Sequence, residues 1–323
     1  MKVLLLGATG LLGHNVLQRL MAEGHQVVAV VRRADGIKLP KGGWETVEGS
    51  ILDYEVLSKA ARGCDAIVNC AGCTDMSLHY VDFLQVNLGV CRLLVRLMDE
   101  QGIKTLVHTS TVNTIGFGTA DKPADESFPM VKPFKGNFYA DSKFGGEQAV
   151  LKAATEGRHV VVVNPGFMLG PWDVKPSSGR MLLAAYRKPL MFAPRGGKAF
   201  VHVGDVAQAI VHALTRGENG RRYIAVNAHA CLTIKELYEM QAQVCGYRQK
   251  VIEVPDWLLL AAGRVGDVLR RMGVKTQVST SNIRQLLVRE NYTNRCAISE
   301  LGMKETPIEV AIREFHEYRK NNQ

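Results

Sequence analysis

Three glycines at intervals of three residues, Gly7, Gly10 and Gly13, follow the first apolar segment of the chain. Residues 2–6 read as a buried strand, and residues 11–22 have the periodicity of a helix. Between a strand and a helix, the first glycine permits a tight turn, the second lets the backbone approach a pyrophosphate, and the third allows close packing. The helix N-terminus adds N–H groups and the positive end of its dipole. The loop predicts a dinucleotide site; the alternative is a glycine-rich turn without a ligand.

Short apolar segments alternate with longer helical patterns through the first half of the chain. We expect strands at 2–6, 26–31, 44–48, 66–70, 104–109 and 158–163, with helices at 11–22, 80–101 and 139–154. Strands that are apolar on both faces are typical of a parallel sheet covered by helices. The sequence therefore predicts an α/β fold, a Rossmann doubly wound parallel sheet, with the ligand at the carboxyl ends of its strands.

After residue 164 the pattern changes, because Gly, Pro and Trp interrupt it and helical segments dominate. We expect helices at 180–187, 203–216, 233–245, 256–272, 279–288 and 306–318, a turn-rich stretch at 188–198 and one strand at 222–227. The predicted domains are an NADP-binding Rossmann domain at 1–163 and a smaller, mainly helical, substrate-binding cap at 164–323. Segments near 200–230 are expected to return to the Rossmann domain.

The composition of the 323 residues is that of a globular protein, with 46% hydrophobic and 22% charged residues. The longest apolar runs fall short of the roughly 18 residues that a membrane span needs. The N-terminus does not resemble a signal peptide, so we expect a cytoplasmic protein with seven free cysteines. The net charge is +9, but Lys and Arg are spread along the chain. We therefore expect neither nucleic acid nor a membrane as a partner.

Arg32 and Arg33 follow the second expected strand, and the first acidic residue after it is Asp35. In a dinucleotide fold, an acidic residue at this place bonds the ribose 2′-hydroxyl of NAD, whereas arginine accommodates the 2′-phosphate of NADP. Arginine holds phosphate through two parallel hydrogen bonds. We therefore expect NADP(H) in preference to NAD(H), with Arg32 as the better candidate and Arg33 as an even choice between phosphate contact and solvated surface charge.

Tyr139 and Lys143 lie four residues apart in an expected helix, which places them on one face. A lysine there is expected to lower the tyrosine pKa and make the phenol a usable general acid toward a carbonyl oxygen. This spacing is common by itself. Here it comes about thirty residues after Thr109, Ser110 and Thr111, which end the fifth expected strand.

The motifs, taken together and in this order, resemble those of the extended short-chain dehydrogenase/reductases. They comprise Gly7-x-x-Gly10-x-x-Gly13, Asp65 with Ala71, Thr109-Ser110-Thr111, Tyr139-x-x-x-Lys143, Asn164-Pro165-Gly166 and the segment 200–207. The resemblance covers essentially the whole chain. Within that superfamily the chain looks most similar to the dihydroflavonol-reductase-like and 3β-hydroxysteroid-dehydrogenase-like group.

The resemblance implies a role for each matching residue. Tyr139 matches the catalytic acid/base, Lys143 the lysine that holds the nicotinamide ribose, and Thr111 the hydroxyl that bonds the substrate oxygen, with Ser110 as its neighbouring candidate. Cofactor contacts are implied for Gly7, Thr9, Gly10, Leu11, Leu12, Gly13, Arg32, Leu52, Asp53, Ala71, Gly72, Lys143, Pro165 and Gly166. Ser50 stands where many members have Asp.

The segment after Pro165 departs from the pattern of the sugar-nucleotide epimerases, which often have Arg before this proline and Asn-x-Tyr after it. Phe167, Met168 and Leu169 follow here instead, which favours an apolar or aromatic carbonyl substrate. The substrate-site candidates are Thr74, Met168, Trp172, Arg180 and His202, with Tyr186, Phe192, His79 and Tyr80 as further possibilities. A competing interpretation as core residues of the cap applies to Met168, Trp172, Arg180, Tyr186 and Phe192, and one as a packing residue beside Asp205 applies to His202.

The predicted function is an NADPH-dependent oxidoreductase that reduces a ketone or aldehyde carbonyl. The alternatives are a nucleotide-sugar epimerase or dehydratase of the same superfamily and a non-catalytic dinucleotide sensor. Cys70 and Cys73 have the spacing of a redox pair, but small residues beside the cofactor explain the position without redox chemistry, and no second pair completes a zinc site. We expect no metal. The helices 80–101 and 139–154 match those that pair in family dimers, so the resemblance implies a homodimer.

Overall fold

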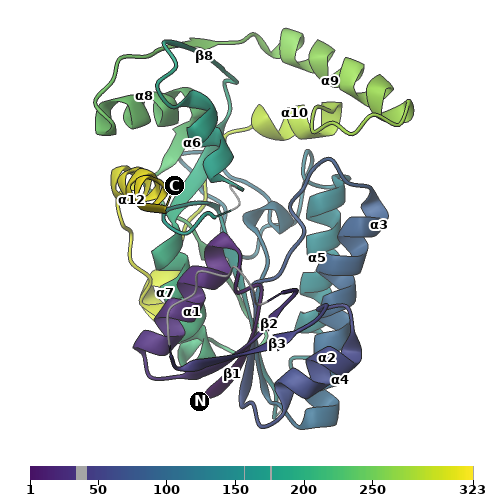
Figure 1. Ribbon diagram of the computed structural model, residues 1–323. Helices are drawn as coiled ribbons and strands as arrows, with labels where there is room; N and C mark the ends of the chain where they lie inside the picture. Colours follow the sequence, from purple (N-terminus) through teal and green to yellow (C-terminus); the bar gives the residue numbers. More distant parts are fainter. Residues whose placement is uncertain (34–41, 156, 175–176, 323) are drawn as a thin grey trace.

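The central sheet of the computed structural model, which describes residues 1–33, 42–155, 157–174 and 177–322, has seven parallel strands (Figure 1). These are β1 (Lys2–Leu6), β2 (Gln26–Val31), β3 (Trp44–Glu48), β4 (Ala66–Asn69), β5 (Thr105–Thr109), β6 (His159–Pro165) and β10 (Arg222–Ala225). Their order is β10-β6-β5-β4-β1-β2-β3, and every neighbouring pair is parallel. The predicted doubly wound Rossmann fold is confirmed, with its topological switch between β1 and β4.

Helices cover both faces of this sheet (Figure 1). One layer holds α1 (Leu11–Ala22) and α7 (Val203–Arg216), and the other holds α2 (Tyr54–Ala61), α4 (Val90–Gln101) and α5 (Phe138–Leu151). Residues of β1 alternate between the layers, since Val3 and Leu5 join the core under α1 while Leu4 and Leu6 join the core under α4. Burial on both faces explains why the strands read as continuous apolar runs.

The single helix expected at 80–101 is three consecutive pieces. They are α3 (Tyr80–Phe83), the π-helical segment η1 (Leu84–Gly89) and α4. The π-helical turn widens the backbone, and it carries the buried side chain of Asn87 toward α5. Such turns are frequent at functional sites, and simple hydrophobic periodicity does not reveal them.

The cap lies over the carboxyl ends of the strands (Figure 1). It contains more strand than the sequence predicted: β7 (Phe167–Leu169), β9 (Gly197–His202) and β11 (Cys231–Thr233) form one small sheet, and β8 (Leu190–Ala193) pairs with β12 (Lys250–Glu253). The expectation of a turn-rich stretch at 188–198 was therefore wrong. The helices of the cap are α6 (Gly179–Ala185), α8 (Ile234–Val244), α9 (Asp256–Arg271), α10 (Thr280–Leu286) and α12 (Ile308–Asn322).

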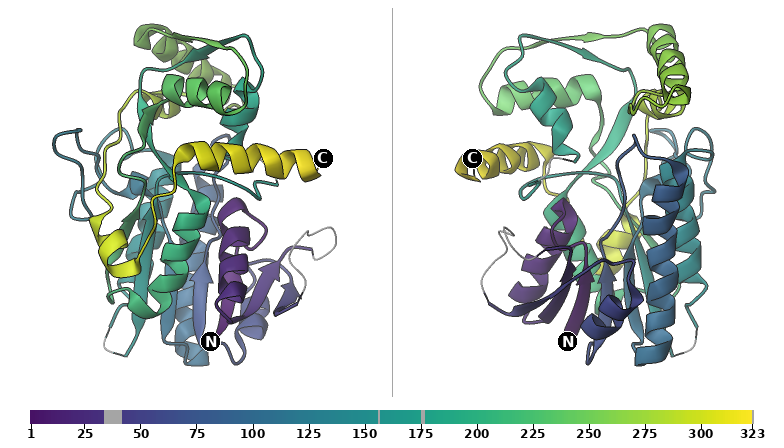
Figure 2. Two further views of the ribbon diagram at one scale, coloured as in Figure 1. Left: turned by 90° about the vertical axis from the view of Figure 1, so that its left-hand side faces the viewer. Right: turned by 45° about the vertical axis from the view of Figure 1, so that its right-hand side comes forward.

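Part of the second half belongs to the Rossmann layers. The strand β10 extends the central sheet beside β6, and α7 packs on α1. A further helix, α11 (Arg295–Leu301), which the sequence did not predict, packs against α7. The chain thus crosses between sheet and cap more than once (Figure 2), and the boundary at 163/164 stays a prediction. Among the described helices, none combines the length and the apolar character that crossing a bilayer requires.

Candidate functional site

The glycine loop between β1 and α1 has one glycine that the protein's own packing does not require. Gly7 has a φ of +85°, and a Cβ there would lie 2.7 Å from the amide nitrogen of Ala71. A Cβ on Gly13 would lie 2.0 Å from the carbonyl oxygen of Gly7. A Cβ on Gly10 would meet only that same oxygen, at an ordinary 3.5 Å. The close approach of a pyrophosphate would explain why the remaining position, Gly10, is also a glycine.

The helix N-terminus beside Gly10 also fits an anion. No acidic residue lies in the first turn of α1, and Gly10 at its N-cap has no side chain that could accept a hydrogen bond. Its N–H groups therefore point toward the loop with their positive dipole end. Thr9 is exposed in the loop, whereas Leu11 and Leu12 are buried in the core below it. These features fit a dinucleotide phosphate, with the leucines contributing backbone only.

The predicted adenosine contacts gather at the ends of β2 and β3. Arg32 follows β2 directly and is exposed, as is Arg33, while Asp35 lies outside the described residues. Leu52 is exposed in the loop after β3, and Asp53 caps α2 by accepting a 2.9 Å hydrogen bond from the amide of the residue two positions later. Exposed Arg32 is available for a 2′-phosphate at this edge.

The loop after β4 connects the glycine loop with the catalytic helix. The side-chain oxygen of Asn69 accepts a 3.1 Å hydrogen bond from the amide of Ala71, which fixes the start of the loop. The next residue, Gly72, has no side chain; a Cβ there would lie 3.7 Å from Nζ of Lys143. The predicted contacts Ala71 and Gly72 therefore lie between the phosphate loop and Lys143.

Tyr139, Lys143 and Thr111 come together where β5 ends and α5 begins. The hydroxyl of Thr111 accepts a 3.3 Å hydrogen bond from the amide of Asn113, so its single proton remains available for donation. The Thr111 side chain also lies close enough to Tyr139 to act on the pKa of the phenol. Nζ of Lys143 donates a 2.6 Å hydrogen bond to the carbonyl oxygen of Thr109. The three side chains predicted to be catalytic thus share one site.

The electrostatics of this site differ from the sequence-based expectation. Burial raises the pKa of Tyr139, and the neighbouring hydroxyl of Thr111 opposes that rise without reversing it. Burial also lowers the pKa of Lys143. The expectation that Lys143 lowers the tyrosine pKa is not met in this structure, because burial dominates and Thr111, not Lys143, is the group that opposes it. Tyr139 consequently holds its proton at neutral pH.

A buried polar network behind Thr111 was not foreseen. Oε2 of Glu147 accepts hydrogen bonds from Thr114 Oγ1 at 2.7 Å and from Asn164 Nδ2 at 2.8 Å. The same Asn164 nitrogen lies 3.1 Å from the carbonyl oxygen of Thr111, and Arg222 of β10 pairs with Glu147 at 3.0 Å. The network ties the backbone of Thr111 to α5. The spacing of Tyr139, Lys143 and Glu147, four residues each, is the signal that would have placed Glu147 on the catalytic face.

Asn87 of the π-helical segment was missed as well. Its side-chain oxygen accepts a 2.8 Å hydrogen bond from the amide of Cys73, and its nitrogen donates to Ser142 Oγ at 2.9 Å. It therefore holds the loop after β4 against the catalytic helix α5. A lone asparagine within the apolar run at 83–90 was the available signal.

Asn137 performs a related task at the start of α5. Its side-chain oxygen accepts hydrogen bonds from the amides of Tyr139 and Ala140, at 3.1 and 3.3 Å. Its side-chain nitrogen lies 3.2 Å from Ser281 Oγ and 3.2 Å from Asn282 Oδ1, both on α10. One buried side chain therefore caps the catalytic helix and holds a helix of the cap.

The substrate-site candidates separate into two groups, and the first comprises Thr74 in the loop after β4, Met168 on β7 and Arg180 on α6. Thr74 is exposed in that loop. Hydrogen bonds from Ser77 lower the pKa of neighbouring Asp75, and the charge of exposed Arg180 of α6 adds a smaller effect in the same direction. Met168 is half-buried on β7, two residues after Gly166, whose amide donates a 3.0 Å hydrogen bond to the carbonyl oxygen of Ala225. Pro165 ends β6.

The further candidates His79 and Tyr80 lie at the start of α3. The ring of Tyr80 stacks on that of Phe138 at 5.1 Å, directly before Tyr139. The backbone amide of His79 donates a 3.1 Å hydrogen bond to Asp82, so His79 begins α3.

The second group of candidates serves packing. The ring of Trp172 stacks on His14 with centroids 3.8 Å apart, and it lies 4.7 Å from the ring of Tyr318. These partners belong to α1 and α12, on the side of the molecule opposite α5 (Figure 1). His202 caps α7 through the amide of Gly204. The structure does not bring Trp172 or His202 to the catalytic side chains.

Tyr186 and Phe192 are likewise placed away from the catalytic residues. Tyr186 stacks on His316 at 4.5 Å within the cap. Phe192 of β8 is exposed on the outer surface of the cap. The expectation that these rings form walls of the substrate pocket was wrong, because the cap directs them to its core and to its outside.

The cysteines beside the cofactor loop lack the properties of a redox pair. Burial raises the pKa of Cys70 to about 12, and burial raises the pKa of Cys73 as well. Reactive pairs instead have lowered thiol pKa values. The hydroxyl of Ser110 is buried and lacks a hydrogen-bond partner among the described residues. Within the described part of the chain, no group of three or more His, Cys, Asp or Glu residues is arranged to hold a metal ion.

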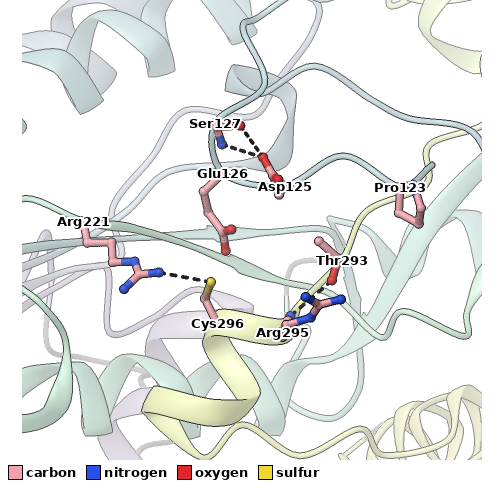
Figure 3. A pocket seen from close by; sticks show the side chains of 8 residues that line it. All are labelled: Pro123, Asp125, Glu126, Ser127, Arg221, Thr293, Arg295 and Cys296. Carbon is pink, nitrogen blue, oxygen red and sulfur yellow. Dashed lines mark hydrogen bonds between the residues drawn. The ribbon is translucent and has the colours of Figure 1, made fainter.

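A cavity of about 510 Å³ lies beside β10, away from these residues (Figure 3). It is lined by Pro123, Asp125, Glu126, Ser127, Arg221, Thr293, Arg295 and Cys296. Its charged groups are largely engaged within the protein: Arg221 pairs with Glu218 at 2.7 Å, and Asp125 accepts from Ser127. None of the residues predicted to be functional lines it.

Comparisons with known proteins show the family of the chain. A family model described as the NAD dependent epimerase/dehydratase family matches residues 3–228. The putative dihydroflavonol 4-reductase of Synechocystis sp. is 28% identical over 98% of this chain and 94% of its own length. A 4-hydroxy-2-methyl-3-oxo-4-farnesyl-3,4-dihydroquinoline-1-oxide ketoreductase of Stigmatella aurantiaca is 29% identical over 84% of this chain and 81% of its own. Among solved structures, gox2253 superposes with a TM-score of 0.84 at 24% identity, covering 100% of this chain and 98% of that one.

Proposed function

Because the chain belongs to the NAD dependent epimerase/dehydratase family, we propose that it is an oxidoreductase that uses NADPH to reduce a ketone or aldehyde carbonyl. The observation that carries the proposal is that the side chains of Thr111 and Tyr139 lie together, close enough for the Thr111 hydroxyl to act on the pKa of the phenol, with Lys143 one helical turn further along α5. Two hydroxyls at one point suit a carbonyl oxygen, which accepts two hydrogen bonds.

The chain's own residues supply orientation and a proton. Gly10 and the N-terminus of α1 would hold the pyrophosphate, and Lys143 the nicotinamide ribose. The bound nicotinamide would supply the hydride. Thr111 would then donate a hydrogen bond to the substrate oxygen, and Tyr139 would transfer its proton to that oxygen. A raised tyrosine pKa suits this direction, since the acid must arrive protonated.

The preference for NADPH rests on Arg32. It stands exposed where β2 ends, the position from which an arginine reaches a 2′-phosphate. A charge-assisted pair with phosphate is worth more than a neutral hydrogen bond, so a single arginine is sufficient to bias the choice.

An apolar or aromatic carbonyl compound is the proposed substrate. Phe167 and Met168 follow the nicotinamide-side turn, and both are half-buried on β7. The name of the Stigmatella relative, a ketoreductase acting on a farnesylated ring, supports this choice. Arg180 is the charged exception, and it favours a substrate that also carries an anionic group.

The test is NADPH consumption over aldehydes, ketones and nucleotide sugars, with NADH in parallel and Tyr139→Phe as the control. Turnover of apolar carbonyls that is lost in the variant supports the proposal. Epimerisation of a sugar nucleotide with retained NADP overturns it in favour of an epimerase. NADPH binding without turnover of any compound on the panel overturns it in favour of a dinucleotide sensor.

A homodimer formed through α3, α4 and α5 is the proposed assembly. These helices pack against one another along one side of the sheet and leave a continuous outer face (Figure 1). Light scattering on the eluted protein tests it: a mass of twice 35.5 kDa supports the dimer, and a mass of 35.5 kDa overturns it.

A further inference from the structure

The helix α9 has its apolar face turned to solvent. On a helix of 3.6 residues per turn, eight positions between 257 and 272 share one face. They are all apolar: Trp257, Leu258, Ala261, Ala262, Val265, Val268, Leu269 and Met272. Trp257 is 70% exposed, Val265 61% and Met272 73%. A helix that packs on a core for stability alone shows the opposite arrangement.

The inward side of α9 consists of two glycines, polar groups and the half-buried side chains of Leu259 and Leu260. Its only buried residues are Gly263 and Gly266, and a Cβ on Gly266 would lie 2.1 Å from the carbonyl oxygen of Val278. Asp267 accepts a 3.1 Å hydrogen bond from the amide of Thr280, and Arg270 donates a 2.9 Å bond to the carbonyl oxygen of Thr276. Close contact and hydrogen bonds therefore fix the orientation, and the apolar face is held outward.

The two-stranded sheet β8–β12, which precedes α9 in the chain, also carries exposed apolar residues. Phe192 and Ile252 are paired across these strands and are 59% and 39% exposed, while their neighbours Met191 and Val251 face the cap core. Leu190 lies two residues before Phe192 and is also exposed. Both elements lie at the end of the molecule opposite the N-terminus (Figures 1 and 2). We define α9 together with β8–β12 as the outer cap surface.

Positive charge surrounds the outer cap surface. Residues 186–196 and 248–275 contain nine Lys and Arg against three Asp and Glu. Arg264 and Arg271 border the apolar face of α9 and are exposed. An amphipathic helix with Trp, Leu and Val on one face and arginines beside it is the kind of element that lies in the interface of an anionic bilayer. Basic residues near such a surface strengthen its attraction to anionic lipid.

We propose that the outer cap surface docks the protein onto a bilayer containing anionic phospholipid. Trp257, Val265, Val268 and Met272 enter the headgroup region, and Arg264 and Arg271 meet the lipid phosphates. This replaces the expectation that a membrane is not a partner, which rested on the even spread of charge along the sequence. The apolar residues and the arginines are brought together only by the fold.

A second copy of the chain is the other occupant that an apolar face suggests. In a two-fold dimer the same patch meets itself, so the excess of Lys and Arg around the outer cap surface of each copy would be brought together. That repulsion opposes self-association, whereas anionic lipid neutralises the same charges. The charge around the surface therefore favours lipid. The proposal does not depend on the proposed reductase activity.

The experiment is sedimentation of the full-length protein with two kinds of vesicle: phosphatidylcholine alone, and phosphatidylcholine mixed with phosphatidylglycerol. We expect binding to the mixed vesicles at low salt, weaker binding at high salt, and little binding to phosphatidylcholine alone. The double variant Val265→Asp/Val268→Asp should bind about tenfold or more weakly. Arg264→Glu/Arg271→Glu should lose the preference for phosphatidylglycerol.

Ile298→Asp is the matched control, since Ile298 is an exposed apolar residue on α11, in the other half of the molecule. It should bind vesicles like the unaltered protein. Because all substituted positions are exposed, thermal unfolding should be unchanged, and this is measured for each variant. Failure of the unaltered protein to bind mixed vesicles overturns the proposal. So does unchanged binding by the double variant, or a double variant that converts a dimer to a monomer.

Discussion

The helices α1 and α9 both pack closely through a glycine, but they place their apolar side chains in opposite ways. Each approaches a backbone carbonyl through a glycine: Gly13 faces the oxygen of Gly7, and Gly266 faces that of Val278. Yet α1 buries eight of its twelve residues, whereas α9 buries two of its sixteen. In α1 the large apolar side chains join the core, and in α9 they face outward.

The two helices reflect a wider contrast between the halves of the molecule, since the candidate catalytic residues are buried and the outer cap surface is exposed. The Rossmann half keeps its chemistry inside, where burial raises the pKa of Tyr139 and holds Lys143 against a carbonyl. The cap keeps a surface outside, held there by glycines and by the hydrogen bonds of Asp267 and Arg270. Each of the following predictions tests whether the halves can be disturbed separately.

The largest effect is expected from Tyr139→Phe. Removing the phenolic proton should lower kcat for carbonyl reduction by about 10²- to 10⁴-fold, the usual contribution of a general acid. Vesicle binding should stay unchanged, because the outer cap surface is untouched. Kinetics and sedimentation on the same preparation measure both. A variant that keeps more than about a tenth of kcat would contradict the role of Tyr139.

Three glycine-to-alanine substitutions test which glycines are required for packing. Gly13→Ala and Gly266→Ala each place a Cβ within about 2 Å of a carbonyl oxygen, so each should lower the free energy of unfolding by about 1–3 kcal/mol. Gly10→Ala is the control, with only an ordinary contact, and it should leave unfolding unchanged while weakening NADPH binding. Urea titration and NADPH fluorescence measure these effects. Equal destabilisation by all three would remove the special place of Gly10.

Arg32→Ala tests the cofactor preference. Loss of a charge-assisted bond to the 2′-phosphate should raise the Kd for NADPH about 10- to 100-fold, with the Kd for NADH nearly unchanged. Arg264→Ala, in the cap, is the matched control and should change neither. Fluorescence titration with both cofactors gives the four constants. If Arg32→Ala weakens both cofactors equally, the 2′-phosphate is not its partner.

The smallest effect is expected at the contact between the halves, where His14 stacks on Trp172. Burial lowers the pKa of His14 to about 4, while an unfolded histidine titrates near 6.5. The unfolded chain therefore binds more protons in this range, so stability is full above pH 6.5 and falls as the pH falls toward 4. Between pH 7.5 and 5 the loss should be about 2 kcal/mol. Urea titrations of His14→Gln should show a correspondingly weaker pH dependence, and parallel curves would show that His14 does not cause it.

The sequence predicted the Rossmann half well because its signals are local. The glycine loop has one structural solution, and the parallel strands are apolar on both faces, so the fold and the family resemblance are confirmed. The meeting of Tyr139, Lys143 and Thr111 also followed, since strand ends and helix starts converge at one edge of a parallel sheet.

The cap was predicted less well for physical reasons. The strands β7, β8, β9, β11 and β12 have three to six residues each, too few for an alternating pattern to stand out. Periodicity showed that 256–272 is a helix but does not state which face turns inward, because glycine contacts and hydrogen bonds decide that. The π-helical turn at Asn87 was invisible for a similar reason, since one extra residue per turn leaves the apolar composition unchanged.

The side chain of Asn137 has a mechanical consequence. Its oxygen caps the helix that begins with Phe138 and Tyr139, and its nitrogen is bonded to α10, which packs on α9. A displacement of α10 must therefore either break these hydrogen bonds or move the first turn of α5 with it. The side-chain amide of Asn137 therefore couples the two halves of the molecule. While its hydrogen bonds hold, a force on the outer cap surface acts through α10 on the backbone of Tyr139.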